Sequence, residues 1–328
     1  MTTMRLPRAL PAVCCAGLAS LVAGCVVHVD SGGFSSRNQM HFLVKGRPVV
    51  DLSTFDGAIE VRSWDKAEVL VQVEARASSK QLLDSIDVAG SSEDSHVIVK
   101  ATVKDMSGWE VSSGGISRSV RLVATVPVDS EVRLRSGDGS VRVERVRGVI
   151  DARTEDGRIV MREVGGEITA DSGDGSVQVE DVDGRCTVNT RDGSVLVSGR
   201  LRGDLKASTG DGSVTVRAAD GSAITGDWNI ETGDGGVVLA LPEQLDAKLD
   251  LHTSDGRIAL NGFTDMPIER EGEGRRLMAV LGSGAGNLRI RTGDGTITLK
   301  RSYGAAAPAP PAPPSPPTAP TAPVAPQP

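Results

Sequence analysis

Aromatic residues and positive charge are scarce in this sequence. Of its 328 residues only 2% are aromatic, and 43 acidic residues outnumber 36 Lys and Arg, which gives a formal net charge of −7. A nucleic-acid-binding surface normally needs a basic face, and stacking sites for bases or sugars need aromatic platforms. The composition therefore predicts a protein that does not bind nucleic acid.

Cysteine is also scarce, with four residues in the whole chain. Cys14 and Cys15 lie in an N-terminal segment that we expect to be removed, and Cys25 lies at its end. Only Cys186 remains in the body of the chain, so we expect no disulfide, no cysteine-based metal site and no cofactor. Cys186 occupies an apolar position of a repeat, which favours a buried small hydrophobe over a reactive thiol.

The N-terminal segment has the pattern of an export signal. Arg5 and Arg8 precede an apolar run, Ala9 to Ala23, that is too short to span a bilayer, and the run ends in "LVAGC". This ending is typical of a bacterial lipobox, so we expect cleavage before Cys25 and a lipid such as palmitate on its thiol. The residue after Cys25 is Val26 and not the Asp that retains enterobacterial lipoproteins in the inner membrane. This favours the outer membrane as the site of anchoring in the bacterial cell envelope. An ordinary secreted protein is the alternative.

The dominant feature of the chain is an Asp-Gly pair that recurs at intervals of 18, 18, 18, 19, 23, 21 and 39 residues. A Ser or Thr stands two residues before each aspartate, and apolar residues alternate with polar ones on both sides. Such alternation predicts a strand, a turn and a second strand in each copy. The pairs are Asp138 and Gly139, Asp156 and Gly157, Asp174 and Gly175, Asp192 and Gly193, Asp211 and Gly212, Asp234 and Gly235, Asp255 and Gly256, and Asp294 and Gly295.

One copy is too short to bury its apolar face, whereas eight stacked copies share a core. The sequence therefore predicts an all-β fold, a β-solenoid of about 18-residue rungs. A meander of antiparallel hairpins is the alternative, because Asp-Gly is also a hairpin turn. A further apolar residue in each rung, at Val146, Val164 and Val182, favours coils, since it provides a third short side.

The expected organisation has five parts. Residues 1–24 are the signal peptide, 25–38 a lipidated tether, 39–130 an irregular β-rich N-terminal cap, 131–303 the solenoid and 304–328 a Pro-rich disordered tail. The cap contains an isolated copy of the repeat at Asp56, and a short helix is expected over Ser78 to Ile86. The long interval between Asp255 and Asp294 is expected to hold an inserted loop and a degenerate rung.

The aspartate column has two interpretations. In the first, each Asp accepts backbone N–H bonds in its turn and each Gly takes a positive φ, so the pair serves only to turn the chain. In the second, stacked carboxylates form a calcium ladder. The candidate ligands are Asp138, Asp156, Asp174, Asp192 and Asp211. One carboxylate per rung offers few of the six or more oxygens that calcium takes, so we favour the turn.

No catalytic constellation stands out. Some β-helices cleave acidic polysaccharides, but they need several acids and a base on one face, and the four histidines here are scattered. Trp228 falls in an apolar column and is expected in the core. Trp109, in a Gly- and Ser-rich loop, is the best candidate for an exposed contact.

Three stretches resemble one bacterial family. They are "GAIEVRSWDKAEVLVQV" (57–73), "VRLVATVPVDSEVRLRSGDGSVRV" (120–143) and "LGSGAGNLRIRTGDGTITL" (281–299). Together they are similar to the toastrack domain, a "putative adhesin" domain of unknown function. The resemblance implies a β-strand-repeat envelope domain without known catalytic residues, used for adhesion-like binding or scaffolding. We therefore expect a lipid-anchored, non-catalytic binding protein whose partner is an envelope protein or a cell-wall component.

Overall fold

Equivalent strands of successive repeats pair in parallel, which makes each Asp-Gly copy one coil of a solenoid. Val141 pairs with Ile159 and Ile159 with Val177, and on the other side of the turn Ile150 pairs with Ile168. Hairpins would pair antiparallel, so the coil prediction is confirmed and the meander is wrong. The structure is a computed structural model that describes residues 26–30, 33–104, 117–263 and 267–302.

The described residues form 24 strands and two short helices. The N-terminal elements are β1 (Val26–Asp30), β2 (Gly33–Leu43), β3 (Val49–Thr54), β4 (Ile59–Trp64), β5 (Glu68–Ala77), α1 (Lys80–Asp84), β6 (Ile86–Glu93), β7 (His96–Val103) and β8 (Arg118–Pro127). The central elements are β9 (Glu131–Ser136), β10 (Val141–Glu144), β11 (Arg147–Thr154), β12 (Ile159–Arg162), β13 (Gly165–Ser172), β14 (Val177–Asn189), β15 (Val195–Thr209) and β16 (Val214–Ala218). The C-terminal elements are β17 (Asp227–Thr232), β18 (Val237–Leu241), β19 (Ala247–Thr253), β20 (Ile258–Asn261), β21 (Ile268–Glu271), η1 (Gly272–Gly274), β22 (Arg276–Leu281), β23 (Gly286–Thr292) and β24 (Ile297–Arg301).

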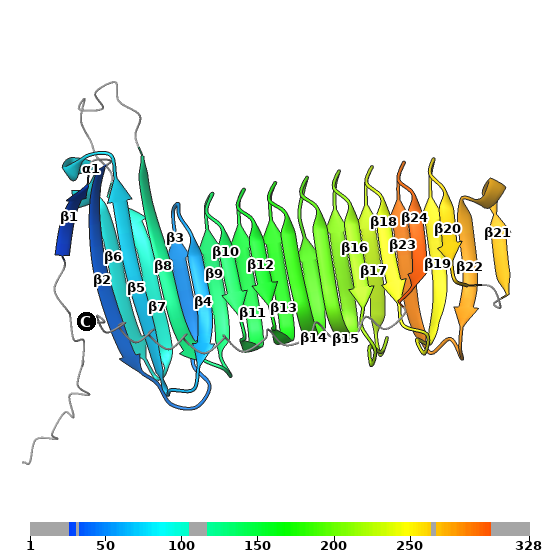
Figure 1. The fold of residues 1–328 in the computed structure, drawn as a ribbon, viewed down its shortest axis with the longest axis horizontal. Helices are drawn as coiled ribbons and strands as arrows, with labels where there is room; N and C mark the ends of the chain where they lie inside the picture. The colour runs from blue at the N-terminus through cyan, green and yellow to red at the C-terminus, as the bar shows by residue number, and fades with distance from the viewer. Residues whose placement is uncertain (1–25, 31–32, 105–116, 264–266, 303–328) are drawn as a thin grey trace, which may run out of the picture.

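The strands build two layers that run the length of the molecule (Figure 1). Sheet I holds the strands that precede each Asp-Gly pair, with β6 and β7 at one end and β22 and β21 at the other, in the order β6, β7, β3, β9, β11, β13, β14, β15, β17, β23, β19, β22, β21. Sheet II holds the strands that follow it, in the order β1, β2, β5, β8, β4, β10, β12, β14, β15, β16, β18, β24, β20. β14 and β15 belong to both sheets because each runs through the corner opposite the turn.

The core lies between the two sheets. Inward side chains such as Val141, Ile150, Ile168 and Val179 are at most 1% exposed. The third apolar position is buried as well, at Val146, Val164 and Val182. The residue just before each of them, Arg145, Glu163 and Asp181, has a φ of 58°, 53° or 54°. A left-handed residue thus turns the chain at this corner so that the next valine points inward.

The N-terminal region stacks on the array in an order that does not follow the chain. β3 and β4, which flank Asp56, pair in parallel with β9 and β10 on one side and with β7 and β8 on the other. The Asp56 copy is therefore a regular coil. Beyond it, β5, β2 and β1 in sheet II and β6 in sheet I pair antiparallel and end the stack. The expected short helix is α1, whose N-cap is Ser79.

The C-terminal end also departs from chain order. β23 and β24, which flank Asp294, lie between the Asp234 coil and the Asp255 coil. The expected degenerate rung is instead an antiparallel pair of strands, β21 and β22, that lies against β19. The last coil along the chain is therefore not the last coil in space.

Candidate functional site

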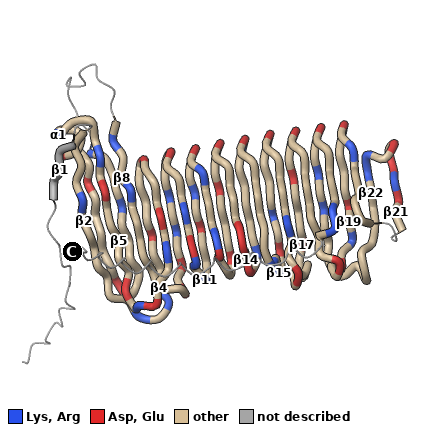
Figure 2. The backbone as a smooth tube through the Cα atoms, in the orientation of Figure 1, with Lys and Arg blue, Asp and Glu red and all other residues tan. Residues whose placement is uncertain are grey.

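The Asp-Gly turns form one continuous edge of the solenoid, and Figure 2 shows an acidic segment at the tip of coil after coil. The eight aspartates of the regular array are all exposed. Two of them have ionic partners: Arg191 Nη1 lies 3.1 Å from Asp174 Oδ1, and Arg275 Nη1 lies 3.7 Å from Asp255 Oδ1. The edge is therefore a row of solvated carboxylates.

The Ser or Thr two residues before each aspartate makes the hydrogen bonds of the turn. Thr209 Oγ1 accepts from the Gly212 N–H at 3.3 Å and donates to the Gly193 carbonyl of the neighbouring coil at 2.8 Å. The equivalent hydroxyl also links coils elsewhere in the stack. The donors and their carbonyl acceptors are Ser136 to Gly57, Thr154 to Gly139, Ser172 to Gly157, Thr190 to Gly175, Thr232 to Gly212, Thr253 to Gly295 and Thr292 to Gly235.

This arrangement corrects the expected role of the aspartate. In the described turns no backbone N–H donates to an Asp carboxylate of the repeat; the hydroxyl takes that place. The sequence contains a signal for this, since the Ser/Thr column is as regular as the Asp column, and the hydroxyl, not the carboxylate, accepts the turn N–H.

The glycines of the pairs are also needed for another reason than expected. None of the eight in the regular array has a positive φ. A Cβ on any of them would instead lie far inside contact distance of the glycine carbonyl in the adjacent coil. Close approach of backbones, and not left-handed geometry, requires glycine here.

A calcium ladder would need carboxylates that converge. Across the described ranges no three His, Cys, Asp or Glu side chains are grouped so that they could hold a metal ion. Stacked coils place one aspartate about 4.8 Å from the next along a straight line, which spreads the oxygens instead of gathering them round one point.

The outer face of sheet I is densely charged, and many of its polar side chains contact one another. Arg153 Nε lies 2.9 Å from Asp151 Oδ1 and 3.5 Å from Asp171 Oδ2, and its pKa is raised chiefly by the hydrogen bond to Asp151. Asn189 Nδ2 donates to Asp171 Oδ1 at 2.6 Å, and Ser208 Oγ donates to Asn189 Oδ1 at 2.6 Å. This face is a ladder of polar contacts from coil to coil.

The outer face of sheet II differs over five successive coils in its C-terminal half, those of Asp174, Asp192, Asp211, Asp234 and Asp294. In the two columns next to the turn, these coils present only uncharged side chains, all at least partly exposed. We call these residues the uncharged patch. Its members are Ser176, Gln178, Ser194, Leu196, Ser213, Thr215, Gly236, Val238, Thr296 and Thr298. At about 4.8 Å per coil the patch is roughly 24 Å long.

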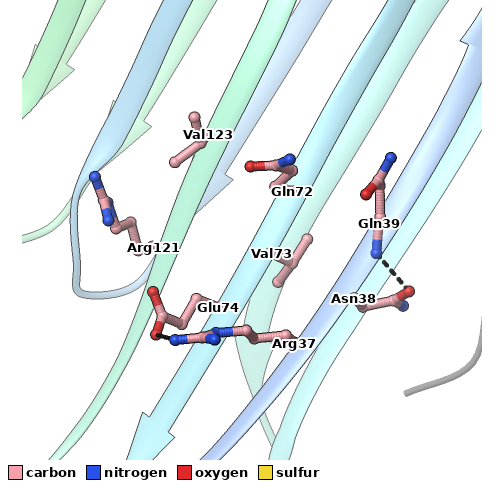
Figure 3. A pocket seen from close by; sticks show the side chains of 8 residues that line it. All are labelled: Arg37, Asn38, Gln39, Gln72, Val73, Glu74, Arg121 and Val123. Carbon is pink, nitrogen blue, oxygen red and sulfur yellow. Dashed lines mark hydrogen bonds and ion pairs between the residues drawn. The ribbon is translucent and has the colours of Figure 1, made fainter. Parts of the chain in front are cut away.

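A groove of about 510 Å³ lies on the same sheet near its N-terminal end, across β2, β5 and β8 (Figure 3). Arg37 Nη2 and Arg76 Nη2 donate to Glu74 Oε1 at 3.1 and 2.8 Å, and the bond from Arg76 is the largest cause of the lowered pKa of Glu74. Arg121 Nη2 pairs with Glu60 at 2.7 Å. The charges around this groove are therefore paired with one another.

The remaining candidate residues are structural or lie outside the described ranges. Cys186 and Trp228 are each 1% exposed, and Trp228 Nε1 donates to the Gly203 carbonyl at 3.0 Å. Burial raises the pKa of the Cys186 thiol to about 12, so the thiol stays protonated at neutral pH. Cys25, Trp109 and the tail 304–328 fall outside the described residues. None of the described helices is both long and apolar enough to cross a membrane.

The fold and the turn edge define a parallel β-solenoid whose coils are joined by hydroxyl-to-carbonyl bonds. The chain belongs to the Toastrack DUF4097 family, whose model matches residues 50–300. Among curated proteins there is no match.

Two of the solved structures that the chain matches carry descriptions that name adhesion. One is described as a putative cell adhesion protein from Clostridium sporogenes, with 13% identity and a TM-score of 0.27 over 81% of this chain and 100% of the other. The second is described as a putative adhesin from Bacteroides fragilis, with 12% identity and a TM-score of 0.33 over 81% of this chain and 97% of the other.

Proposed function

We propose that the protein is a non-catalytic binding or scaffolding protein of the bacterial cell envelope, held to the outer membrane by a lipid on Cys25. The observation that carries the binding role is the stack of coils itself. Parallel sheets tied by backbone and hydroxyl bonds form a straight, rigid support that presents side chains in register. Such a support binds without having to be ordered first, which lowers the entropic cost of association.

We assign the binding surface to the uncharged patch. The centres of protein interfaces are depleted in charged residues. In the patch, five successive coils of sheet II carry no charged side chain in the two columns next to the turn, whereas the same columns of sheet I carry charges. The sheet I face is different, because it carries charges in every part and pairs such as Arg153 with Asp151 and Asp171 would have to be displaced by a partner. The partner we expect is an envelope protein or a cell-wall component.

Two threonines allow a matched test of this assignment. Thr215 lies in the patch on sheet II and Thr187 on the outer face of sheet I, and both are half-buried strand residues. Tagged full-length protein carrying Thr215→Arg or Thr187→Arg would be crosslinked in cells, and copurifying molecules identified. We expect Thr215→Arg to lose a specific partner that Thr187→Arg retains. Equal retention would contradict the assignment, and turnover of an acidic glycan by the purified protein would contradict a non-catalytic role.

The anchor is tested separately. Metabolic labelling with a palmitate analogue should label the wild-type protein and leave Cys25→Ser unlabelled, and the variant should leave the membrane fraction. A labelled Cys25→Ser variant would place the lipid elsewhere.

A further inference from the structure

Among the described residues, the N-terminal end of the solenoid has a strand edge that is only partly paired. β1 pairs with β2 from Gly33 to Arg37 only, and the rest of β2, Asn38 to Leu43, pairs with β5 on one side and with no described strand on the other. We call residues 38–43 the free edge. The backbone N–H of Gln39 bonds to no described strand on this side and donates instead to the side chain of its own neighbour, Asn38 Oδ1, at 2.7 Å (Figure 3).

The composition of the free edge is unlike that of the opposite end. At the C-terminal end the edge strand β21 carries Glu269, Arg270 and Glu271, all exposed, and charge is how proteins keep an edge from pairing. The free edge contains no Lys, Arg, Asp or Glu. It contains Met40 and Phe42, in a chain with four phenylalanines in total.

The apolar side chains of the free edge close the end of the core only in part. Met40 and Phe42 are half-buried and pack against the core, and both lie over β6 at Gly90, where a Cβ would meet the Met40 sulfur and come within 3.3 Å of Phe42 Cζ. Leu43, the last residue of β2, is 86% exposed. Met and aromatic residues beside uncharged neighbours are typical of protein interfaces.

We propose that the free edge pairs with the free edge of a second copy of this chain. Two identical strands meet antiparallel when a twofold axis runs perpendicular to the sheet, and twofold dimers are the commonest oligomers. The N–H of Gln39 points away from β5, so the backbone groups of Gln39, His41 and Leu43 are the ones directed outward. An antiparallel copy supplies matching groups at the same residues.

The position of β1 selects the register. Val26 already occupies the place opposite Arg37. If the twofold axis passed through Met40, Leu43 of the second copy would lie opposite Arg37, where Val26 already pairs. If the axis passes through His41, residues 39–43 of the two copies pair with one another, and Asn38 separates this pairing from β1. In the His41 register, Met40 of each copy meets Phe42 of the other on the inner side. The two partly open cores then cover each other.

The contact is short, about 17 Å of strand at 3.4 Å per residue. It lies below the size of a stable solution dimer, so the association is weak in solution and strengthens where copies are held together on one surface. The free edge is a different surface from the uncharged patch.

Cysteine crosslinking in cells tests the pairing. In the His41 register the two Cα atoms at residue 41 lie about 5.5 Å apart, within disulfide range. Full-length His41→Cys should form a disulfide dimer at least about tenfold faster than Gln72→Cys, because thiols held in register react at a raised effective concentration. Gln72 is the matched control, since it is exposed on the same face, on β5, opposite Gln39.

The wild-type chain, which keeps Cys25 and Cys186, sets the baseline for crosslinking. Equal rates for the two variants would overturn the proposal, and so would a disulfide from Cys at position 41 to a different protein. Sedimentation of the purified full chain gives a second readout. His41→Lys places two ammonium groups at the axis and should weaken self-association about tenfold or more. Unchanged self-association in this variant would also overturn the proposal.

Discussion

Two adjacent glycines in one turn make a sharp test of how the coils are packed. At Gly235 a Cβ would overlap the Gly212 carbonyl oxygen and lie 2.5 Å from the Gly212 carbonyl carbon and 2.9 Å from Thr232 Oγ1, while at Gly236 the nearest atom, the Thr296 carbonyl oxygen, is 3.4 Å away. Neither residue has a positive φ. We predict that Gly235→Ala destabilises the protein and that Gly236→Ala does not.

The size of the effect follows from the separation that the new methyl group demands. An ordinary contact begins at 3.4 Å, so the Asp234 and Asp211 coils must part by at least 3.4 − 2.5 = 0.9 Å. That shift breaks two bonds between the coils, the one that Thr232 Oγ1 donates to the Gly212 carbonyl at 2.8 Å and the one that the Gly233 N–H donates to the Gly210 carbonyl at 2.6 Å. Two lost hydrogen bonds at about 1 kcal/mol each, with some strain, give roughly 3 kcal/mol.

Gly236→Ala lowers only the conformational entropy of the unfolded chain, which stabilises the folded protein by about 0.4–1 kcal/mol. Thermal unfolding of the two variants should therefore shift in opposite directions. We expect Tm to fall by roughly 6–12 °C for Gly235→Ala and to rise by up to about 4 °C for Gly236→Ala. Shifts of the same sign and similar size would refute the close-approach argument.

Three further predictions concern single side chains. Thr209→Val keeps the volume but removes the hydroxyl between coils and should cost about 1–3 kcal/mol, with Thr209→Ser recovering the hydrogen-bond part, as measured by urea unfolding. Cys186 should not react with a thiol reagent at pH 8 until the protein unfolds; rapid reaction of the folded protein would contradict its burial. Because folding raises the Cys186 pKa from 9.0 to about 12, the folded state binds the proton more tightly, so its contribution to stability is full below pH 9 and is lost as pH rises from 9 towards 12. The Cys186→Ala variant should lack this part of the alkaline loss; an identical pH profile would contradict it.

Local features of the fold could be predicted because each repeat carries its own instructions. Alternation around Asp-Gly predicts two strands, and the extra apolar residue, Val164 in the Asp156 coil, predicts a third side that the structure confirms. The buried columns that include Cys186 and Trp228 could be found in the same way, because burial follows from period-two spacing.

The candidate site was less predictable. The Ser/Thr column is visible in the sequence, but the bonds that its hydroxyls donate run between coils. A donor in one coil and its acceptor in the next are related only by the stacking register. The patch and the free edge likewise arise from which coils lie side by side. Neither is a motif in the chain.

The sequence by itself determined that coils form, where each turn lies and which side chains face inward, since these depend on residues a few positions apart. Only the tertiary structure decided the order of the coils. The Asp294 coil lies between the Asp234 and Asp255 coils, and the Asp56 coil lies beside the Asp138 coil. The physical reason is that all coils present nearly the same parallel strand edges and glycine carbonyls. The sequence within one coil therefore does not specify which other coil lies beside it. Toward the two ends of the stack, β5 and β22 pair antiparallel with their neighbours, so the parallel array stops there.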